Sequence, residues 1–449
     1  MKKIIIILFL ITLLLSFNNF AMAIERSELT GQWEGEINIS GQKLGIIVKI
    51  SENEEDLVGS LDIPAQGAMG IPLGKINLEN NDVFLTVPML QGNVKFKGKL
   101  ENSKISGDFK QSGYSFPFEL RKVSDKIEAK KEINYATGNY EIEEKEIKVE
   151  VEGGELAGTL ALPKKINKEL PIVILVAGSG PTDRDGNNLL LNVEINTLKE
   201  IAHYLSSNGI MTFRYDKRGI KESSALMKGE TDSFLKYRDD LMTVIDYFNS
   251  YEKVKNDELY VLGHSEGAML TIMAAEKGSN VNGLILLSGS GHTFAKTLRT
   301  QITAIAEQYS KAGYENINEE MLKALDDMYE AVRNDSDFDI NDYTIPDKMK
   351  DTYLSIINQR KFTKDWLDVN PVQLLNNVDE DVCIIQGTTD SRVGVEDAKL
   401  LASAVPEDHL EIHILEGINH YLKKAETGNP APEKRINENL LKTVKNFVN

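Results

Sequence analysis

The chain of 449 residues is poor in cysteine and has no long apolar segment. Its only cysteine is Cys383, so an intrachain disulfide is excluded and the core must form by packing alone. A chain of this length can bury enough apolar surface for that. The apolar run at residues 4–15 is shorter than the roughly 20 residues that a membrane-spanning helix needs.

Positive charge is also scarce, because 51 Lys and Arg stand against 69 Asp and Glu and give a net charge of −18. Such acidity disfavours nucleic acids and anionic membranes as partners, and it favours solubility. The sequence has no P-loop, no metal-ligand cluster and no dinucleotide-binding G-x-G-x-x-G after a predicted strand. We therefore expect no cofactor and no metal.

The first 23 residues have the pattern of a secretory signal peptide. Lys2 and Lys3 precede the apolar run, and Ala-Met-Ala at residues 21–23 follows a polar spacer. This pattern predicts cleavage after Ala23 and a secreted or periplasmic protein without membrane insertion. No cysteine lies near the cleavage point, which disfavours lipid attachment. Cleavage removes two lysines, so the net charge of the mature chain is about −20.

Residues 24–122 alternate polar and apolar side chains in short runs, with Gly, Asn and Asp at about ten-residue spacing. This spacing predicts an antiparallel β meander that closes into a small barrel or sandwich. The sequence Gly-Gln-Trp-Glu-Gly at residues 31–35 weakly resembles the opening of lipocalin-like barrels. We interpret Trp33 as a core residue rather than a ligand platform. A charged linker is predicted at residues 123–139.

Strands and helices alternate from about residue 140. Strands are predicted near 158–162, 170–177, 210–215, 258–264, 283–288, 382–387 and 411–415. Helices are predicted near 196–208, 232–250, 266–277, 395–404 and 433–448. This alternation favours a doubly wound, mostly parallel α/β sheet with helices on both faces, over residues 140–449.

The sequence Gly-His-Ser-Glu-Gly at residues 263–267 stands between an apolar strand and a helix-forming run. A serine on such a sharp strand-to-helix turn has strained backbone, and bulky neighbours would clash there. The start of the next helix also favours negative charge beside the serine. We therefore predict that Ser265 is a nucleophile; the alternative is an ordinary glycine-rich turn.

A serine hydroxyl needs a base to accept its proton. His420 fits best, because it follows the last strand on a loop near the C-terminus; the alternative is a surface histidine. His264 lies inside the serine motif, and we expect its side chain to point away from the side chain of Ser265. The remaining histidines lie in or near predicted helices and strands, or at the start of the segment that interrupts the alternation: His203, His292, His409 and His413.

The acid that orients the base should lie between Ser265 and His420. Asp390 follows the strand at residues 382–387, and open α/β sheets keep their chemistry at the carboxyl ends of strands. The alternative is that Asp390 only caps the next helix. Glu396 and Asp397 are less suited, because they lie on that helix.

An acyl-transfer site also needs two donors for the oxyanion. We assign the backbone N–H of Glu266 and that of Ser179, which follows the strand at residues 170–177. Gly178 or Gly180 could replace Ser179. The acidic and basic residues at 183–185 are expected to brace this loop by ion pairs.

The order Ser265, Asp390, His420 resembles that of the α/β-hydrolase superfamily. The resemblance is closer to bacterial secreted carboxylesterases, which carry G-H-S-E-G and S-G-P-x-D-R-D-G-N; the second motif stands here at residues 179–187. The similarity covers roughly residues 140–449. The D-x-R-G pattern at residues 216–219 also resembles a loop of these hydrolases, with Asp216 and Arg218 as structural residues.

The resemblance implies that the long insertion after residue 288 is a helical cap, at about residues 290–380. Helices are predicted there at 297–312, 319–334 and 347–359. We expect most of its aromatic residues to pack the cap onto the main domain, and a few to line an acyl pocket.

The resemblance also implies hydrolysis of a small-molecule carboxylic ester through an acyl-enzyme. A serine peptidase acting on short peptides would use the same three residues and stays open as an alternative. A further alternative, of another class, is a binding protein that acts through the N-terminal β domain. The sequence specifies no oligomeric state.

Overall fold

The computed structural model describes residues 26–39, 42–53, 56–63, 68–87, 94–111, 114–124, 134–165, 168–188, 194–226, 233–425 and 434–449. The predicted signal peptide and most of the predicted linker lie outside these residues. The chain divides into two compact units, Met1–Lys131 and Glu132–Asn449, called here the β unit and the α/β unit. No helix in the described ranges is long and apolar enough to cross a membrane.

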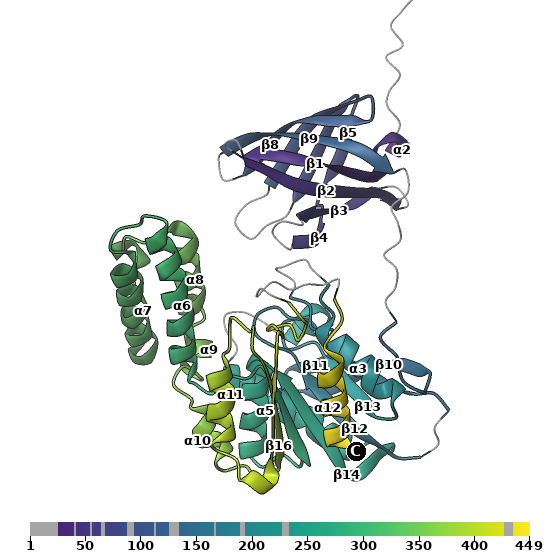
Figure 1. The fold of residues 1–449 in the computed structure, drawn as a ribbon, viewed down its shortest axis with the longest axis vertical. Coiled ribbons are helices and arrows are strands. Elements are labelled where there is room, and N and C mark those ends of the chain that lie inside the picture. Colours follow the sequence, from purple (N-terminus) through teal and green to yellow (C-terminus); the bar gives the residue numbers. More distant parts are fainter. Residues whose placement is uncertain are drawn as a thin grey trace, which may run out of the picture. The chain divides into compact units, whose positions relative to one another are not determined.

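The described part of the β unit is one antiparallel sheet of nine strands in the order β4-β3-β2-β1-β9-β8-β7-β6-β5 (Figure 1). Its elements are α2 (Arg26–Leu29), β1 (Gly31–Ile39), β2 (Gln42–Asn53), β3 (Asp56–Ile63), β4 (Ala68–Pro72), β5 (Ile76–Glu79), β6 (Asp82–Val87), β7 (Val94–Glu101), β8 (Lys104–Gln111) and β9 (Tyr114–Ser124). The sheet is nearly barrel-shaped, and the predicted antiparallel β fold is confirmed. Strand β9 extends to Ser124, two residues into the predicted linker.

Alternate side chains of these strands point inward and form a single apolar core. Strand β7 shows this plainly, since buried and exposed residues alternate along its whole length. Trp33 is fully buried, and its Nε1 donates a hydrogen bond of 2.8 Å to the carbonyl of Leu29. Phe96 packs against Phe109 and Phe118 with ring centroids 4.9 and 5.1 Å apart. Side chains therefore fill the interior.

The α/β unit contains an eight-stranded sheet in the order β10-β11-β13-β12-β14-β15-β16-β17. The strands are β10 (Ile142–Val151), β11 (Gly154–Pro163), β12 (Leu170–Val176), β13 (Met211–Tyr215), β14 (Val254–His264), β15 (Gly283–Leu287), β16 (Asp381–Gly387) and β17 (Leu410–Leu415). Strand β11 is antiparallel to β10 and β13, and the other pairs are parallel. The predicted mostly parallel sheet is confirmed.

Helices cover both faces of this sheet, because the side chains of its central strands alternate between two apolar cores. In β12, Ile172 and Ile174 enter the core under one set of helices, whereas Val173 and Leu175 enter the core on the other side. The first set is α4 (Phe234–Asn249), α5 (Glu266–Glu276), α10 (Pro371–Leu375) and α11 (Val395–Ala402). The second set is α3 (Thr197–Ser207) and α12 (Glu438–Val448).

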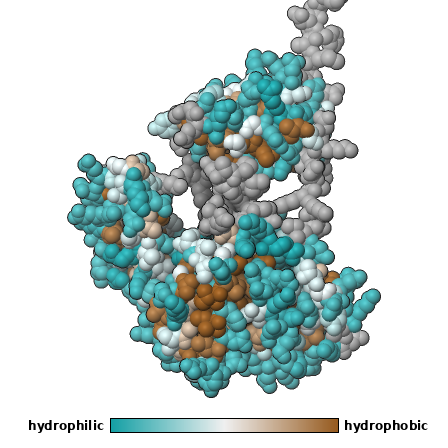
Figure 2. Space-filling model, viewed as in Figure 1, coloured by the Kyte–Doolittle hydropathy of each residue, from teal (hydrophilic) through white to brown (hydrophobic). Residues whose placement is uncertain are grey.

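The insertion between β15 and β16 is helical, as predicted, and part of it forms a lobe with a core of its own (Figure 1). Its helices are α6 (Phe294–Lys311), α7 (Ile317–Asn334), α8 (Asp347–Asn358), α9 (Arg360–Lys364) and the α10 already given. The ring of Trp366 stacks on those of Phe294 and Phe234, with centroids 4.1 and 4.4 Å away, and so joins the lobe to α4. In Figure 2 the visible surface of the lobe is mostly hydrophilic.

Short 3-10 helices complete the described elements, namely η2 (Lys221–Leu226), η3 (Ile340–Asp342) and η4 (Glu407–His409).

Candidate active site

Ser265 lies on the turn between β14 and α5, where the carboxyl end of a central strand meets the first turn of a helix. Its backbone has φ 56° and ψ −116°, a strained conformation for a residue with a side chain. The turn is held by its own amide, which donates a 2.9 Å hydrogen bond to the carbonyl of Leu287 in β15. The strain is therefore imposed by the surrounding sheet.

The two glycines of the motif are required by close contacts. A Cβ on Gly263 would lie 2.3 Å from the carbonyl oxygen of Gly267, and a Cβ on Gly267 would lie 2.3 Å from that of Val176. Both contacts are with backbone, which cannot move aside as a flexible side chain can. Any larger residue would push α5 away from β12 and β14. The spacing of the motif thus follows from sterics.

Asp390 and His420 meet beside this turn. Asp390 follows β16, His420 follows β17, and these neighbouring parallel strands end on the same edge of the sheet. The Nδ1 atom of His420 and the Oδ2 atom of Asp390 are 2.9 Å apart, and both side chains are almost wholly buried. A carboxylate can only accept, so Nδ1 carries the proton and Nε2 is the free basic nitrogen of the neutral ring.

Asp390 is held as an ionised acceptor. Burial by itself raises the pKa of this carboxyl, but other contacts outweigh it and lower the pKa to about 2. These contacts are the hydrogen bond and charge of His420, followed by the backbone N–H groups of Val393 and Arg392. Both N–H groups donate to Oδ1, at 3.0 and 2.9 Å. One oxygen is thus fixed by the loop, and the other faces His420.

His264 lies next to Ser265 in sequence and packs beside His420. Its ring lies 5.0 Å from that of His420, and its Nε2 is 2.8 Å from the backbone carbonyl of His420. The carbonyl only accepts, so Nε2 of His264 donates. Burial above all, and then the charge of His420, lower the pKa of His264 to about 3. His264 is therefore a neutral donor that holds the loop of His420.

A pocket of about 370 Å³, counting space open to solvent, lies at this edge of the sheet. Three of the predicted site residues line it, namely Ser179, Ser265 and His420, while Asp390 lies behind His420 and Glu266 points elsewhere. The residues that line it are Gly178, Ser179, Thr182, Gly186, Asn188, His264, Ser265, Arg392, His420 and Tyr421. They include no residue of the helical insertion, so the described pocket does not contain the cap aromatics that the sequence led us to expect.

Lys217 is a site residue that the sequence analysis passed over, although it lies between Asp216 and Arg218. Its Nζ donates to the carbonyl of Gly178 at 2.6 Å and to Oε1 of Glu266 at 2.7 Å. The side chains of Lys217 and Glu266 are 3% and 5% exposed, so this ion pair is shielded from water. It connects the loop after β12 to the first residue of α5. These are the two segments that carry the predicted oxyanion donors.

The loop at residues 179–187 is fastened mainly by charged side chains. Asp183 accepts from the amides of Asp185 and Asn187 at 3.0 and 2.9 Å. Arg184 pairs with the buried Asp216 at 2.8 Å. Asp185 in turn accepts from Arg214 of β13 at 2.7 Å. Each of these side chains is used within the protein, so they hold the loop that lines the pocket.

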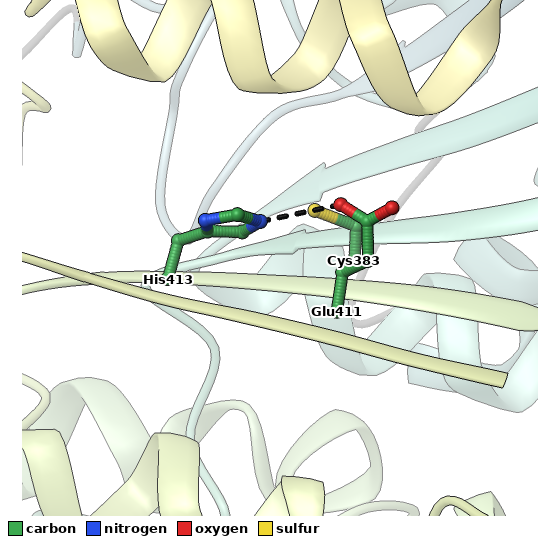
Figure 3. Close-up of side chains that lie close together, drawn as sticks. All are labelled: Cys383, Glu411 and His413. Atoms are coloured by element: carbon green, nitrogen blue, oxygen red, sulfur yellow. Dashed lines mark hydrogen bonds and ion pairs between the residues drawn. The ribbon is translucent and has the colours of Figure 1, made fainter. Parts of the chain in front are cut away.

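One group of described residues could hold a metal ion. Glu411 and His413 occupy alternate positions of β17, and Cys383 is the register partner of Glu411 on β16 (Figure 3). Their ligand atoms lie within 4.8 Å of one another, a donor set that suits a borderline-soft cation such as Zn²⁺. Burial, however, strongly raises the pKa of the Cys383 thiol, and a cation of this kind needs the thiolate. None of the three lines the pocket.

Part of the chain is similar to known sequences. A family described as serine aminopeptidase, S33, matches residues 191–355. The chain is also 32% identical to Esterase EstD of Thermotoga maritima over 164 residues, which are 36% of this chain and 35% of that protein. The chain therefore covers about a third of that relative's length. The family match includes Ser265 and ends before Asp390 and His420.

Solved structures to which the chain shows some similarity include the acylaminoacyl peptidase of Pyrococcus horikoshii, with a TM-score of 0.45 and 13% identity over 92% of this chain and 62% of that chain. Est1E from Butyrivibrio proteoclasticus, solved with ferulic acid bound, has a TM-score of 0.40 and 16% identity over 67% of this chain and 96% of that chain. At these TM-scores the likenesses carry no argument about function. The chain thus combines a mostly parallel α/β sheet with a strained serine after β14, and over part of its length it is similar to an esterase and to the serine aminopeptidase family.

Proposed function

We propose that the protein is a serine hydrolase that cleaves small carboxylic esters through an acyl-enzyme. The observation that carries the proposal is that Ser265 and His420 line one pocket while His420 is bonded to the buried Asp390 at 2.9 Å. In this scheme Oγ of Ser265 attacks the ester carbonyl, and Nε2 of His420 takes its proton. Asp390 keeps the ring in the required tautomer and stabilises its cation. The proton then goes to the leaving alcohol, and water repeats the cycle.

The negative charge of the tetrahedral intermediate needs donors beside Ser265. We propose the backbone N–H groups of Glu266 and Ser179. Glu266 is the first residue of α5, where the helix itself supplies no acceptor for the amide. Ser179 lines the pocket directly after β12. Lys217 acts as a positioning residue, since it binds both segments from behind.

An aminopeptidase is the second candidate, because the family match carries that description. Such an enzyme needs an acidic group for the α-ammonium of its substrate. The residues that line the described pocket include no Asp or Glu, and they do include Arg392. A cation at this position repels an ammonium group. This contrast favours esters over peptides with a free N-terminus.

A binding role inside the β unit is disfavoured, because side chains fill its interior. We also propose that residues 1–23 are a cleaved export signal, so that the protein is secreted or periplasmic. Sequencing of the mature N-terminus from the exported fraction should then begin at Ile24. A mature protein that still begins at Met1 would contradict this.

The test compares Ser265→Ala with Ser288→Ala. Ser288 is a good control because it also follows a sheet strand and has a positive φ, of 49°, but it does not line the pocket. Wild type and S288A should hydrolyse p-nitrophenyl esters, and a fluorophosphonate should label them only at Ser265. S265A should lose activity by about a millionfold and keep its circular dichroism spectrum. Labelling at another residue, or activity in S265A, would overturn the assignment. Faster cleavage of aminoacyl-nitroanilides than of esters would favour the peptidase.

A further inference from the structure

Arg392 is the one permanently charged side chain among the residues that line the described pocket. The other lining residues are glycines, neutral polar side chains, Tyr421 and two histidines. The chain as a whole carries a charge of −18, so an anionic substrate gains nothing from the general field of the protein. Among the side chains that line this pocket, Arg392 is therefore the one that offers a permanent positive charge to an anion.

The guanidinium of Arg392 is held in place on the side of His420. Its Nη2 donates a hydrogen bond of 2.7 Å to the hydroxyl of Tyr421, and the group lies 5.2 Å from the centre of that ring. Tyr421 is buried and directly follows His420. At the backbone, the amide of Arg392 donates to Asp390, and its carbonyl accepts from Gln301 at 3.4 Å. Arg392 is an exposed residue, and these contacts place its guanidinium beside the proposed catalytic pair.

The guanidinium still has donors to offer. Of the residues that the structure describes, none places a carboxylate in ion-pair contact with Arg392. Asp390 is the nearest acid in sequence, but its oxygens already accept from His420 and from the backbone N–H groups of the loop. An arginine has five N–H donors in a planar fork that matches the two oxygens of a carboxylate. The hydrogen bond to Tyr421 uses one of these donors, so most of the N–H groups of the guanidinium can bind a ligand.

We propose that Arg392 is a binding subsite for a carboxylate of the substrate, so that the enzyme prefers esters that also carry a free carboxylate. The proposal rests on the hydrolase activity proposed above and names its substrate class. Arg392 acts through binding and orientation, because it brings the anionic end of the ester to the rim where Tyr421 adjoins His420. It takes no part in proton transfer.

The experiment uses the full-length protein and two pairs of matched esters. One pair differs in the alcohol, 4-carboxyphenyl butyrate against 4-carbamoylphenyl butyrate, and the other in the acyl group, monophenyl adipate against its neutral terminal amide. The readout is the ratio of kcat/KM for the anionic member to that for the neutral member. In wild type at least one pair should give a ratio well above one. In Arg392→Gln that ratio should fall roughly 10- to 100-fold.

Two variants separate recognition from general effects. Lys399→Gln makes the same change in net charge on α11, at a lysine that pairs with Glu396 and does not line the pocket, and should keep the wild-type ratio. Arg392→Lys keeps the charge but loses the fork, and should give an intermediate ratio. Added salt should lower the wild-type ratio and leave that of R392Q almost unchanged.

The outcomes are distinct. If neither member of either pair is cleaved, the proposed esterase function fails and this inference fails with it. If the neutral esters are cleaved but wild type shows no preference for the anionic members, only the carboxylate subsite is overturned. Equal losses on both members in R392Q would also overturn it, because they would show that Arg392 only supports the loop of Asp390 and Tyr421.

Discussion

The two units of this chain differ most in how many charged side chains they bury. Among its described residues, the β unit buries one charged side chain, Asp62, which pairs with Lys49 at 2.8 Å. The α/β unit buries many, including Asp183, Arg184, Lys217 and Glu266. These latter groups gather at the carboxyl edge of the central strands, around Ser265. Burying a charge costs free energy unless it is paired and hydrogen-bonded.

The buried charges that surround the proposed catalytic residues therefore lie in the α/β unit, whereas the β unit is held together mainly by its apolar core. The β unit is an apolar core closed by a sheet, and nothing in its described interior is arranged to react. The α/β unit keeps the same kind of apolar core under its sheet and adds a layer of buried ion pairs at one edge. Those ion pairs fix loops that would otherwise move. Changing a buried charge should therefore alter catalysis in one unit and only stability in the other.

The largest contrast is expected between Asp390→Asn and Asp62→Asn. In the α/β unit, the amide would leave His420 in the wrong tautomer and without a partner for its cation, so kcat should fall about 10⁴-fold. In the β unit, loss of the partner of Lys49 should leave kcat and KM for a p-nitrophenyl ester as they are. Steady-state kinetics on both variants measures this. Near wild-type activity in D390N would remove Asp390 from the triad, and Glu396 or Asp397 would then be tested.

A smaller contrast is expected between Lys217→Met and Lys49→Met. Without Lys217 the carbonyl of Gly178 and the carboxylate of Glu266 lose their common donor, so the proposed oxyanion donors drift. We expect kcat to fall about 100-fold with little change in KM, while K49M retains kcat. K217M also leaves Glu266 buried and unpaired, which can cost about 3–5 kcal/mol.

The double variant Lys217→Met with Glu266→Met addresses that cost, because it removes both charges. It should recover much of the stability, measured by urea unfolding, and remain slow. Recovery of kcat along with stability would show that the ion pair serves the fold alone.

The smallest expected effect is a loss of stability of the α/β unit at acid pH. The pKa of His264 is about 3 in the folded protein and near 6.5 when the chain is unfolded, so between these values the unfolded state binds the extra proton. The contribution of His264 to the free energy of unfolding of the α/β unit is therefore at its maximum above pH 6.5. Below pH 6.5 it decreases by about 1.4 kcal/mol for each pH unit. From pH 7.5 to 5 the loss should be about 2 kcal/mol, and His264→Gln should remove it.

The two tryptophans allow each unit to be followed separately, since Trp33 lies in the β unit and Trp366 in the α/β unit. Urea unfolding of Trp33→Phe reports the α/β unit, and that of Trp366→Phe reports the β unit. All six histidines lie at position 203 or beyond, so the β unit should show no loss from histidine protonation over this range. An equal loss in both units would contradict the role given to His264.

Much of the fold could be predicted because it depends on local patterns. The period-two runs of the β unit and the alternating strands and helices of the α/β unit reflect burial of one or both faces of each element. Strand β10 was not predicted, because its sequence lacks such a burial pattern. It is an edge strand whose residues 143–146 are all charged, which keeps such edges soluble but resembles a linker in sequence. The short strands β4 and β5 also carry too few residues to show a period.

What the sequence by itself determined is the set of residues whose neighbours lie close along the chain. The serine turn is the clearest case, because Gly263 is needed for a close contact with Gly267 within one strand, turn and helix. Only the tertiary structure decided which distant side chains share the site: Lys217 with Glu266, His264 with the carbonyl of His420, and Arg392 with Tyr421. The physical reason is that these pairs form only when parallel strands end at a common edge, and the order of those strands in the sheet is not written in any short stretch of sequence.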